Sequence, residues 1–225
     1  MNNIVSPAQF KLFFIGIIFI SMAAFLPKPI EPKRSDYLPP PVAVKYLSVG
    51  MSYQLADSLW LRALQDFDYC EKKLNEKECF GKSWLFQTLN LATEIDPVFE
   101  PLMYRAAGLA LTVIISDYAG ASVIFDKAVK HYPDNWNVTY VAAYHAWYEE
   151  KNKMKAARLY EQAAKTGAPN WVYALAGRLA KDDGEDEYSQ KILETMIATN
   201  QDEKIIKRLR DKIFEVEASR KSQNK

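Results

Sequence analysis

The side chains with catalytic or metal-binding potential are few and widely spaced. His131 and His145 are the only histidines, and they stand 14 residues apart, whereas a zinc-binding helix places two histidines one turn apart, as in H-E-x-x-H. Gly81-Lys82-Ser83 matches the end of a phosphate-binding loop, but position 76 is Glu where that motif requires its first glycine. No G-x-S-x-G nucleophile motif occurs. The sequence therefore predicts a protein that is not an enzyme, with no metal and no cofactor.

Paired carboxylates are the other pattern that could support acid–base chemistry. Asp182-Asp183 and Glu149-Glu150 form such pairs, and both fall at the ends of predicted helices. We interpret them as solvent-facing charges. An enzyme with an unrecognised site is the alternative from a different functional class.

Cys70 and Cys79 are the only cysteines, and they flank a loop rich in lysine and glutamate. Two cysteines that close one loop are typical of a disulfide in an oxidising compartment. In the chain-entropy model such a short loop would contribute about 2–3 kcal/mol. Two unrelated thiols are the alternative, and the stretch offers too few ligands for a zinc site.

Composition limits the class of protein that must position these residues. The chain has 225 residues, of which 49% are hydrophobic and 25% charged, with a net charge of +1. This balance disfavours nucleic-acid binding, which needs a surplus of Lys and Arg. Only 8 residues are glycine, and no run alternates with a period of two. An all-α fold is therefore expected.

An uncharged run at residues 12–26, after a flank at 1–11, predicts a membrane segment. As a helix it would be roughly 22 Å long, somewhat short of the hydrocarbon core, although Lys11 could extend its reach by snorkelling. It is either an uncleaved transmembrane anchor or a signal segment cut near Ser21-Met22-Ala23. The apolar run continues past that site, which favours the anchor.

Residues 27–41 contain six prolines and are predicted to be a semi-stiff spacer. Lysine and arginine on both sides of the membrane segment leave its orientation open, and a plain count would keep the chain in the cytoplasm. The cysteine pair and the usual behaviour of short N-terminal anchors favour the other side. We expect a single-pass inner-membrane protein with the bulk of the chain extracytoplasmic.

Helical periodicity dominates the rest of the chain. Residues 42–97 are expected to form an atypical first helix pair around the loop 70–79, residues 98–200 regular helix pairs, and residues 201–225 a capping helix and tail. The expected helices span 42–69, 83–95, 98–115, 118–131, 136–151, 154–165, 170–181, 185–198 and 202–219.

A repeated block identifies the architecture more closely. Ala121, Phe125, Ala128 and Pro133 return as Ala156, Tyr160, Ala163 and Pro169, and prolines at 97, 133 and 169 give a period of 36 residues. This pattern resembles the tetratricopeptide repeat (TPR) family, whose units pair two antiparallel helices, with small residues at the crossing and proline after the second helix. The resemblance implies an α-solenoid. Tyr144 stands where the family favours glycine.

A second resemblance concerns the segment that follows the spacer. The stretch from Tyr37-Leu38-Pro39 to Gln65, including Ala56-Asp57-Ser58-Leu59-Trp60-Leu61-Arg62-Ala63, is similar to the leader region of bacterial membrane-anchored TPR proteins. The similarity implies a setting in the bacterial cell envelope and names no reaction.

The TPR resemblance also implies where a partner would bind, because first helices line the groove of that family. Carried over by position, the groove would present arginine beside aromatic and aliphatic side chains, a mixture suited to a peptide or helix. Packing into the core is the alternative role for these residues. The Asn and Lys set of the family's carboxylate clamp is missing, which argues against a chaperone-tail binder. The candidates are Arg105, Leu109, Val141, His145, Tyr148, Trp171 and Arg178, with Leu102, Thr112, Val138 and Ala174 beside them.

These observations predict a membrane-anchored scaffold that binds envelope proteins through its concave helical face. The alternative is an accessory subunit of a membrane transporter or secretion complex that docks through its anchor and the helix 42–69.

Overall fold

The computed structural model describes residues 17, 21, 39–46, 50–65 and 81–223. The chain divides into two compact units, residues 1–36 and 37–225, and the second contains nearly all of the described part. The expected segment 12–26, its flank 1–11, most of the spacer 27–41, and Cys70 and Cys79 lie outside the described residues. Within the described ranges, no helix combines the length and the apolar character needed to cross a membrane.

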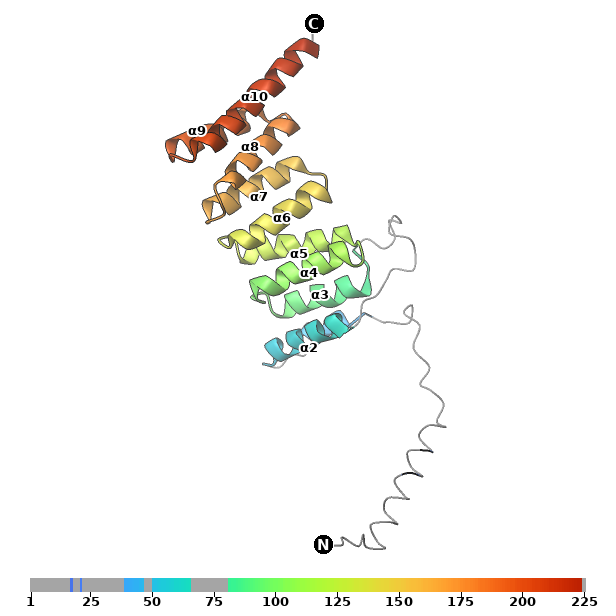
Figure 1. Ribbon diagram of the computed structural model, residues 1–225. Helices are drawn as coiled ribbons and strands as arrows, with labels where there is room; N and C mark the ends of the chain where they lie inside the picture. Colours follow the sequence, from blue (N-terminus) through green and yellow to red (C-terminus); the bar gives the residue numbers. More distant parts are fainter. Residues whose placement is uncertain (1–16, 18–20, 22–38, 47–49, 66–80, 224–225) are drawn as a thin grey trace, which may run out of the picture. The chain divides into compact units, whose positions relative to one another are not determined.

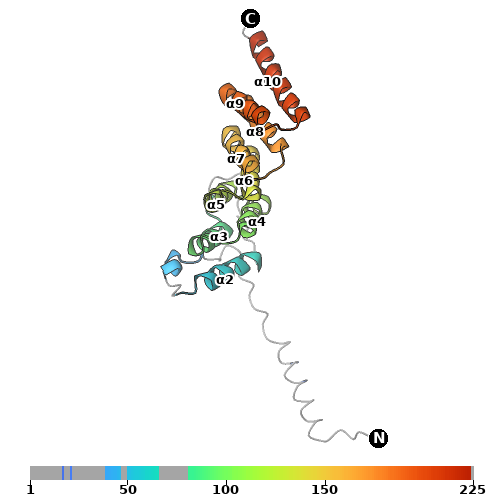
Figure 2. The same cartoon turned by 90° about the vertical axis from the view of Figure 1, so that its left-hand side faces the viewer.

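The second unit is all-helical over its described residues. Each α-helix packs against the next one along the chain, and the helices follow one another as successive layers (Figures 1 and 2). The elements are the 3-10 helix η2 (Val42–Tyr46) and the α-helices α2 (Ser52–Gln65), α3 (Trp84–Ile95), α4 (Pro101–Val113), α5 (Tyr118–His131), α6 (Trp136–Tyr148), α7 (Lys153–Lys165), α8 (Trp171–Asp183), α9 (Asp186–Ala198) and α10 (Glu203–Gln223).

The observed helices differ from the expected ones mainly at their ends. The expected helix 42–69 is not continuous, because Gly50 adopts a φ of 81° and α2 begins only at Ser52. α4 begins at Pro101 rather than at residue 98, since proline is well suited to the first turn of a helix but not to its interior. α10 extends beyond the expected end at residue 219.

The turns inside successive helix pairs share one geometry. Ser116 and Lys151 have φ values of 54° and 57°, and the next residues, Asp117 and Asn152, cap α5 and α7. The backbone N–H groups of Asp117 and Asn152 donate to carbonyl groups near the end of the preceding helix, at 2.8 and 2.9 Å. A left-handed residue followed by an N-cap therefore reverses the chain in the same way at both turns.

Two hydrophobic clusters make up the core, and they meet at α6. One extends from α2 to α6 and the other from α6 to α10. Small residues allow the close approach of helices within them: a Cβ on Gly108 of α4 would lie 2.4 Å from the ring of Phe125 in α5, which is almost fully buried. The aromatic ring occupies the space that a larger residue on α4 would need.

Asp117 joins the starts of two helices. Its carboxylate caps α5 by accepting from the N–H of Gly120 at 2.9 Å, and it also accepts from the N–H of Gly81 at 2.6 Å and the hydroxyl of Ser83 at 2.8 Å. Ser83 in turn accepts from the N–H of Phe86 and caps α3. The buried carboxylate thus fixes the N-terminus of α3 against that of α5.

Replacing Asp117 with alanine should lower the free energy of unfolding by about 2–3 kcal/mol, because three donors lose a buried acceptor. Asn152→Ala is the matched control, since Asn152 occupies the same turn position but its side-chain oxygen accepts from the exposed N–H of Lys155. Its cost should be about 1 kcal/mol. Urea unfolding followed by circular dichroism measures both. Equal losses would show that the contacts to Gly81 and Ser83 contribute nothing.

The C-terminal helix is held by a buried cation. Lys181 of α8 is fully buried, and its ammonium lies 2.9 Å from carboxylate oxygens of Asp186 and Glu217. Burial alone would lower the pKa of Lys181, but hydrogen bonds to these two carboxylates outweigh it and raise the pKa. Arg220 of α10 also contacts both Asp186 oxygens at 2.9 Å. These contacts fix α10 against α8 and α9.

Candidate protein-binding face

The first helices of three successive pairs, α4, α6 and α8, carry exposed apolar and aromatic side chains. Leu109, Tyr144, Tyr148 and Trp171 are 43%, 47%, 44% and 46% exposed, and Arg178 is exposed as well. We call these five residues the first-helix face. Large side chains at such exposures are available to a partner, whereas their helical neighbours fill the core.

The buried positions of the first helices define their register. Tyr104, Ala107, Gly108 and Leu111 of α4 are buried, and the residues 35 positions later, Thr139, Ala142, Ala143 and Ala146 of α6, are buried too. A further shift of 34 gives Tyr173, Ala176, Gly177 and Ala180 of α8, which are also buried.

In this register Leu109, Tyr144 and Arg178 occupy one equivalent position of three successive helices. Each directly follows the small buried residue at the helix crossing: Gly108, Ala143 or Gly177. In repeat proteins, equivalent residues of stacked units lie on the same side, so we expect these three side chains to form a row along the first-helix face.

The structure separates the predicted groove residues into three groups. Leu109, Tyr148, Trp171 and Arg178 are exposed, as is Leu102, whereas Arg105, Val141 and Thr112 are half-buried. Val138 and Ala174 belong to the core. His145, predicted for the groove, is only 3% exposed, and this corrects its assignment: it is a core residue and not a surface for a partner.

The error at His145 comes from the proline period. A spacing of 36 makes His145 the counterpart of Leu109, but the buried pattern shows a spacing of 35, which makes Tyr144 the counterpart. The same shift places Ala143, not Tyr144, at the glycine position. Pro97, Pro133 and Pro169 precede the next helix by four, three and two residues, so the prolines do not repeat in step with the helices.

His145 joins three helices through polar contacts. Its Nδ1 lies 3.2 Å from the Thr112 hydroxyl on α4, and its Nε2 lies 3.0 Å from the Ser122 hydroxyl and 3.2 Å from the Tyr118 carbonyl on α5. Burial lowers the pKa of the imidazole, an effect that Glu150, the Tyr118 carbonyl and Glu149 partly oppose and Lys155 reinforces. A neutral ring with the proton on Nε2 donates to α5, and the Thr112 hydroxyl beside Nδ1 also lies 2.9 Å from the Gly108 carbonyl, to which it donates.

Acidification should destabilise the wild-type protein more than His145→Gln. The folded state favours the neutral ring, so the pKa of His145 is lower in the folded state than its ordinary value of 6.5. Below pH 6.5 the unfolded chain therefore binds more protons than the folded one. The free energy of unfolding falls as the pH drops from 6.5 to the pKa of the folded state. Burial would raise the pKa of Glu150, but hydrogen bonds from Lys155 and Ser122 outweigh it and lower the pKa below 4.5. The contribution of Glu150 to the free energy of unfolding is therefore lost only below pH 4.5, outside the range of this comparison. Urea unfolding of both proteins at about pH 7.5 and about pH 5.5 measures the difference. Parallel losses would contradict this role of His145.

Arg105 has a different environment from the exposed Arg178. Its side chain is half-buried on α4, and its Nε is buried with no hydrogen-bond partner among the described residues. A buried guanidinium nitrogen without an acceptor carries a desolvation cost. Arg105 is therefore a less accessible contact for a partner than Arg178.

Aromatic contacts organise the centre of the first-helix face. The rings of Tyr144 and Tyr148 stack with centroids 4.5 Å apart, and Trp147 lies 4.8 Å from Tyr148. On α8, Trp171 packs edge-on against Tyr140 of α6 at 6.0 Å. Rings fixed by one another lose little further freedom on binding and offer apolar area with hydroxyl groups at its rim. Such a surface suits the side chains of a protein segment.

Two residues of interest escaped the sequence-based prediction. Tyr144 was assigned to a helix crossing, and the 35-residue spacing of the small residues at 108 and 143 is the signal that would have placed it on the surface. Arg208 of α10 lies beside Arg178 in a cleft, and the interpretation of residues 201–225 as a cap gave no reason to select it.

The described residues contain no group of three or more potential metal-binding side chains. Comparison of the chain with protein-family models, with curated proteins and with solved structures gave no match. The TPR resemblance of the repeated block stays a prediction from the sequence.

Proposed function

We propose that this chain is a non-enzymatic scaffold that binds protein partners through the first-helix face. The observation that carries this proposal is the recurrence of an exposed side chain at one equivalent position, Leu109, Tyr144 and Arg178, each next to a buried small residue. Aromatic and arginine side chains contribute strongly to binding at protein interfaces. Clustered apolar side chains at the surface typically mark an interaction site.

We further propose that the helices form an α-solenoid of the TPR type. The repeated turn, with Ser116 and Lys151 in the left-handed region, supports this assignment, as does the recurrence of buried positions after 35 and 34 residues. These spacings lie close to the 34 residues of a TPR unit. In a solenoid the equivalent faces of successive units combine into one extended binding surface.

The uncharged run at residues 12–26 supports the proposal that the scaffold is anchored in the inner membrane, with the bulk of the chain extracytoplasmic. Anchoring would raise the effective concentration of the binding face near membrane partners. The spacer at 27–41 would hold that face away from the bilayer.

The test is purification from native membranes in mild detergent, with identification of the co-purifying proteins by mass spectrometry. The full chain is compared with a chain lacking residues 1–41 and with the double variant Leu109→Ser, Tyr144→Ser. A scaffold should retain its partners without residues 1–41 and lose them in the double variant. Val123→Ser is the matched control, because Val123 is an exposed apolar residue on α5, a second helix of its pair, and is not part of the first-helix face.

One observation favours the accessory-subunit function as a second candidate. Tyr53, Leu61 and Leu64 on α2 are more than half exposed, which leaves apolar surface on the helix that follows the spacer. If partners survive the double variant at Leu109 and Tyr144, the docking site lies outside the first-helix face and the scaffold proposal fails. Loss of the partners without residues 1–41 would then place docking in the anchor, and their retention would leave α2, which that truncated chain keeps.

A further inference from the structure

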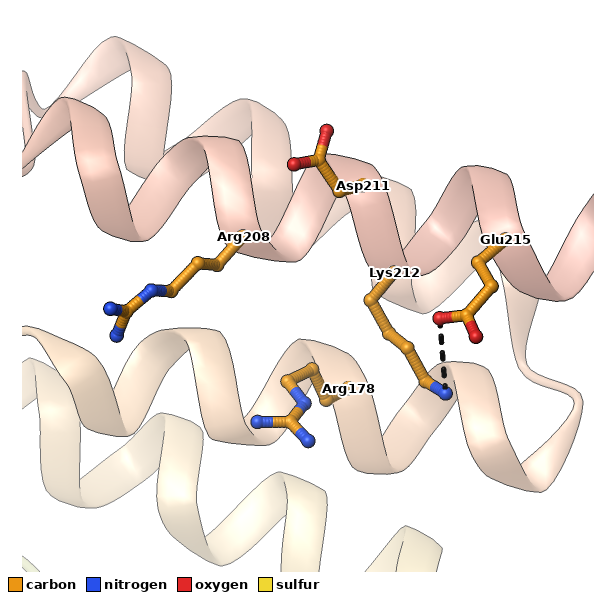
Figure 3. Close-up of a pocket in the computed structure, with 5 residues that line it drawn as sticks. All are labelled: Arg178, Arg208, Asp211, Lys212 and Glu215. Atoms are coloured by element: carbon orange, nitrogen blue, oxygen red, sulfur yellow. Dashed lines mark ion pairs between the residues drawn. The ribbon is translucent and has the colours of Figure 1, made fainter.

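A charged cleft lies between α8 and α10, at the C-terminal end of the first-helix row. It has a volume of about 490 Å³ and is lined by Arg178 of α8 and by Arg208, Asp211, Lys212 and Glu215 of α10. Figure 3 shows the side chain of Arg208 extending from α10 toward α8, whereas the side chain of Arg178 lies over α8 itself and Asp211 points away from α8.

The three cations of the cleft differ in their partners. Lys212 is neutralised by Glu215 at 3.7 Å and Asp182 at 3.8 Å. Neither Arg178 nor Arg208 has an ion pair within the described part of the chain. Two guanidinium groups therefore line one cleft without an ion-pair partner of their own among the described residues, and each presents a planar fork of donors.

We propose that this cleft binds carboxylate groups of an acidic segment in the partner protein, an inference that rests on the proposed function. Two guanidinium groups can each pair with a carboxylate through two parallel hydrogen bonds. Bringing one acidic segment between them would relieve the mutual repulsion of Arg178 and Arg208 and complete their hydrogen bonding.

The surrounding charges favour a carboxylate over a phosphate. Asp211 and Glu215 belong to the lining of the cleft, and Asp182 lies beside Lys212. These carboxylates would repel a dianion or a polyanion more strongly than a single carboxylate. The local charge thus selects a weakly charged acidic segment and disfavours phosphorylated or nucleic-acid ligands.

The walls of the cleft are held in place by the fold. A Cβ on Gly177 would lie 2.8 Å from Leu209, so the glycine permits α8 and α10 to approach closely. Lys181, one turn further along α8, pairs with Glu217, about two turns further along α10. Arg178 and Arg208 therefore extend from fixed backbones, which reduces the ordering required on binding.

The cleft continues the row of the first-helix face, because Arg178 is the counterpart of Leu109 and Tyr144. A segment crossing the first helices from α4 to α8 would carry apolar side chains for Leu109 and Tyr144, followed by an acidic one for Arg178.

The experiment is selection of random peptides, displayed on phage, against the full chain in phosphatidylcholine nanodiscs. Selected peptides should be enriched in Asp and Glu following apolar residues. Selection against the double variant Arg178→Gln, Arg208→Gln should lose the acidic bias but keep the apolar one. Arg210→Gln is the matched control, because Arg210 is exposed on α10 and does not line the cleft. The affinity of a selected peptide should fall about tenfold with either single change, Arg178→Gln or Arg208→Gln.

The possible failures are distinguishable. If no peptide is selected, the proposed function and the acidic site both fail. If peptides are selected without an acidic bias, or if the bias survives in the double variant, only the acidic site is overturned. Displacement of a selected peptide by millimolar phosphate but not by millimolar acetate would reassign the cleft to phosphate and also overturn the inference.

Discussion

Shortening Phe125 to alanine should lower the free energy of unfolding by about 3–5 kcal/mol and should reverse the effect of a methyl group added at Gly108. Phe125 is 2% exposed in the cluster that joins α4, α5 and α6, and removal of a buried aromatic ring leaves a large cavity. Its ring atoms lie 2.4–2.7 Å from the position of a Cβ on Gly108. In the wild type, Gly108→Ala should therefore cost about 1–3 kcal/mol through overpacking.

In the Phe125→Ala background the same change at Gly108 should be neutral or should stabilise the chain by up to about 1 kcal/mol. The clash is gone, and alanine favours the helix over glycine by about that amount. Urea unfolding of the wild type, both single variants and the double variant completes the thermodynamic cycle. Additive losses would show that Gly108 and Phe125 are not coupled and that a different contact requires the glycine.

Tyr160 provides an internal comparison for this contact. It lies 35 residues after Phe125, and Ala143 lies 35 residues after Gly108; all four are buried. The second unit therefore accommodates one more carbon atom at the helix crossing. Ala143→Gly should cost about 1 kcal/mol from helix propensity alone. A preference for glycine at position 108 and for alanine at position 143 would therefore reflect packing and not the helix.

The helices and their pairing could be predicted from the sequence because their signals are local. Apolar residues recur at helical spacing in α5 and α7, and the expected start and end of α5, Tyr118 and His131, coincide with those observed. The ends of helices are also local. Gly184, with a φ of 96°, ends a helix because glycine adopts the left-handed conformation without a steric penalty. The all-helical fold follows from such features without knowledge of tertiary contacts.

The register of the binding face depends on tertiary contacts and could not be read from the same signals. Prolines mark the loops between pairs, but the distance from proline to helix varies between units, so the proline spacing does not fix which side of a helix is buried. His145 looks like a groove residue among aromatic neighbours. Its polar partners, Thr112 and Ser122, come from other helices, and nothing local to residue 145 indicates them.

The charged cleft between α8 and α10 also depends on tertiary contacts, so the sequence alone does not predict it. Arg178 was selected from its place on a first helix, but Arg208 belongs to a helix that appeared to be only a cap. The two meet because Gly177 lets Leu209 approach and because Lys181 binds Glu217. Each of these pairs joins residues more than thirty positions apart, and no periodic pattern in the sequence reports them.

Tyr144→Ser should lower the affinity of the chain for a co-purified partner by at least about tenfold, without a large change in thermal stability. Tyr144 is nearly half exposed and stacks only on the similarly exposed Tyr148. Its removal therefore deletes contact area for the partner but leaves no cavity in the core. Calorimetric titration with the purified partner measures the affinity, and thermal unfolding confirms that the variant is folded.

The neighbouring variant His145→Ser tests whether the repeat spacing is 35 residues, as the buried positions indicate, or 36 residues, as the prolines suggest. With the 35-residue spacing, His145 is a core residue, so its loss should lower the melting temperature while the folded protein keeps its affinity. With the 36-residue spacing of the prolines, His145 would be the contact residue and Tyr144 the packing residue. Affinity lost at His145 and retained at Tyr144 would thus reject the first-helix face as defined here, whereas the opposite pattern ties binding to the row of Leu109, Tyr144 and Arg178. Because the two residues are adjacent, any effect of serine on the helical stability of α6 is the same in both variants. The variants differ only in that Tyr144 is exposed and His145 is buried.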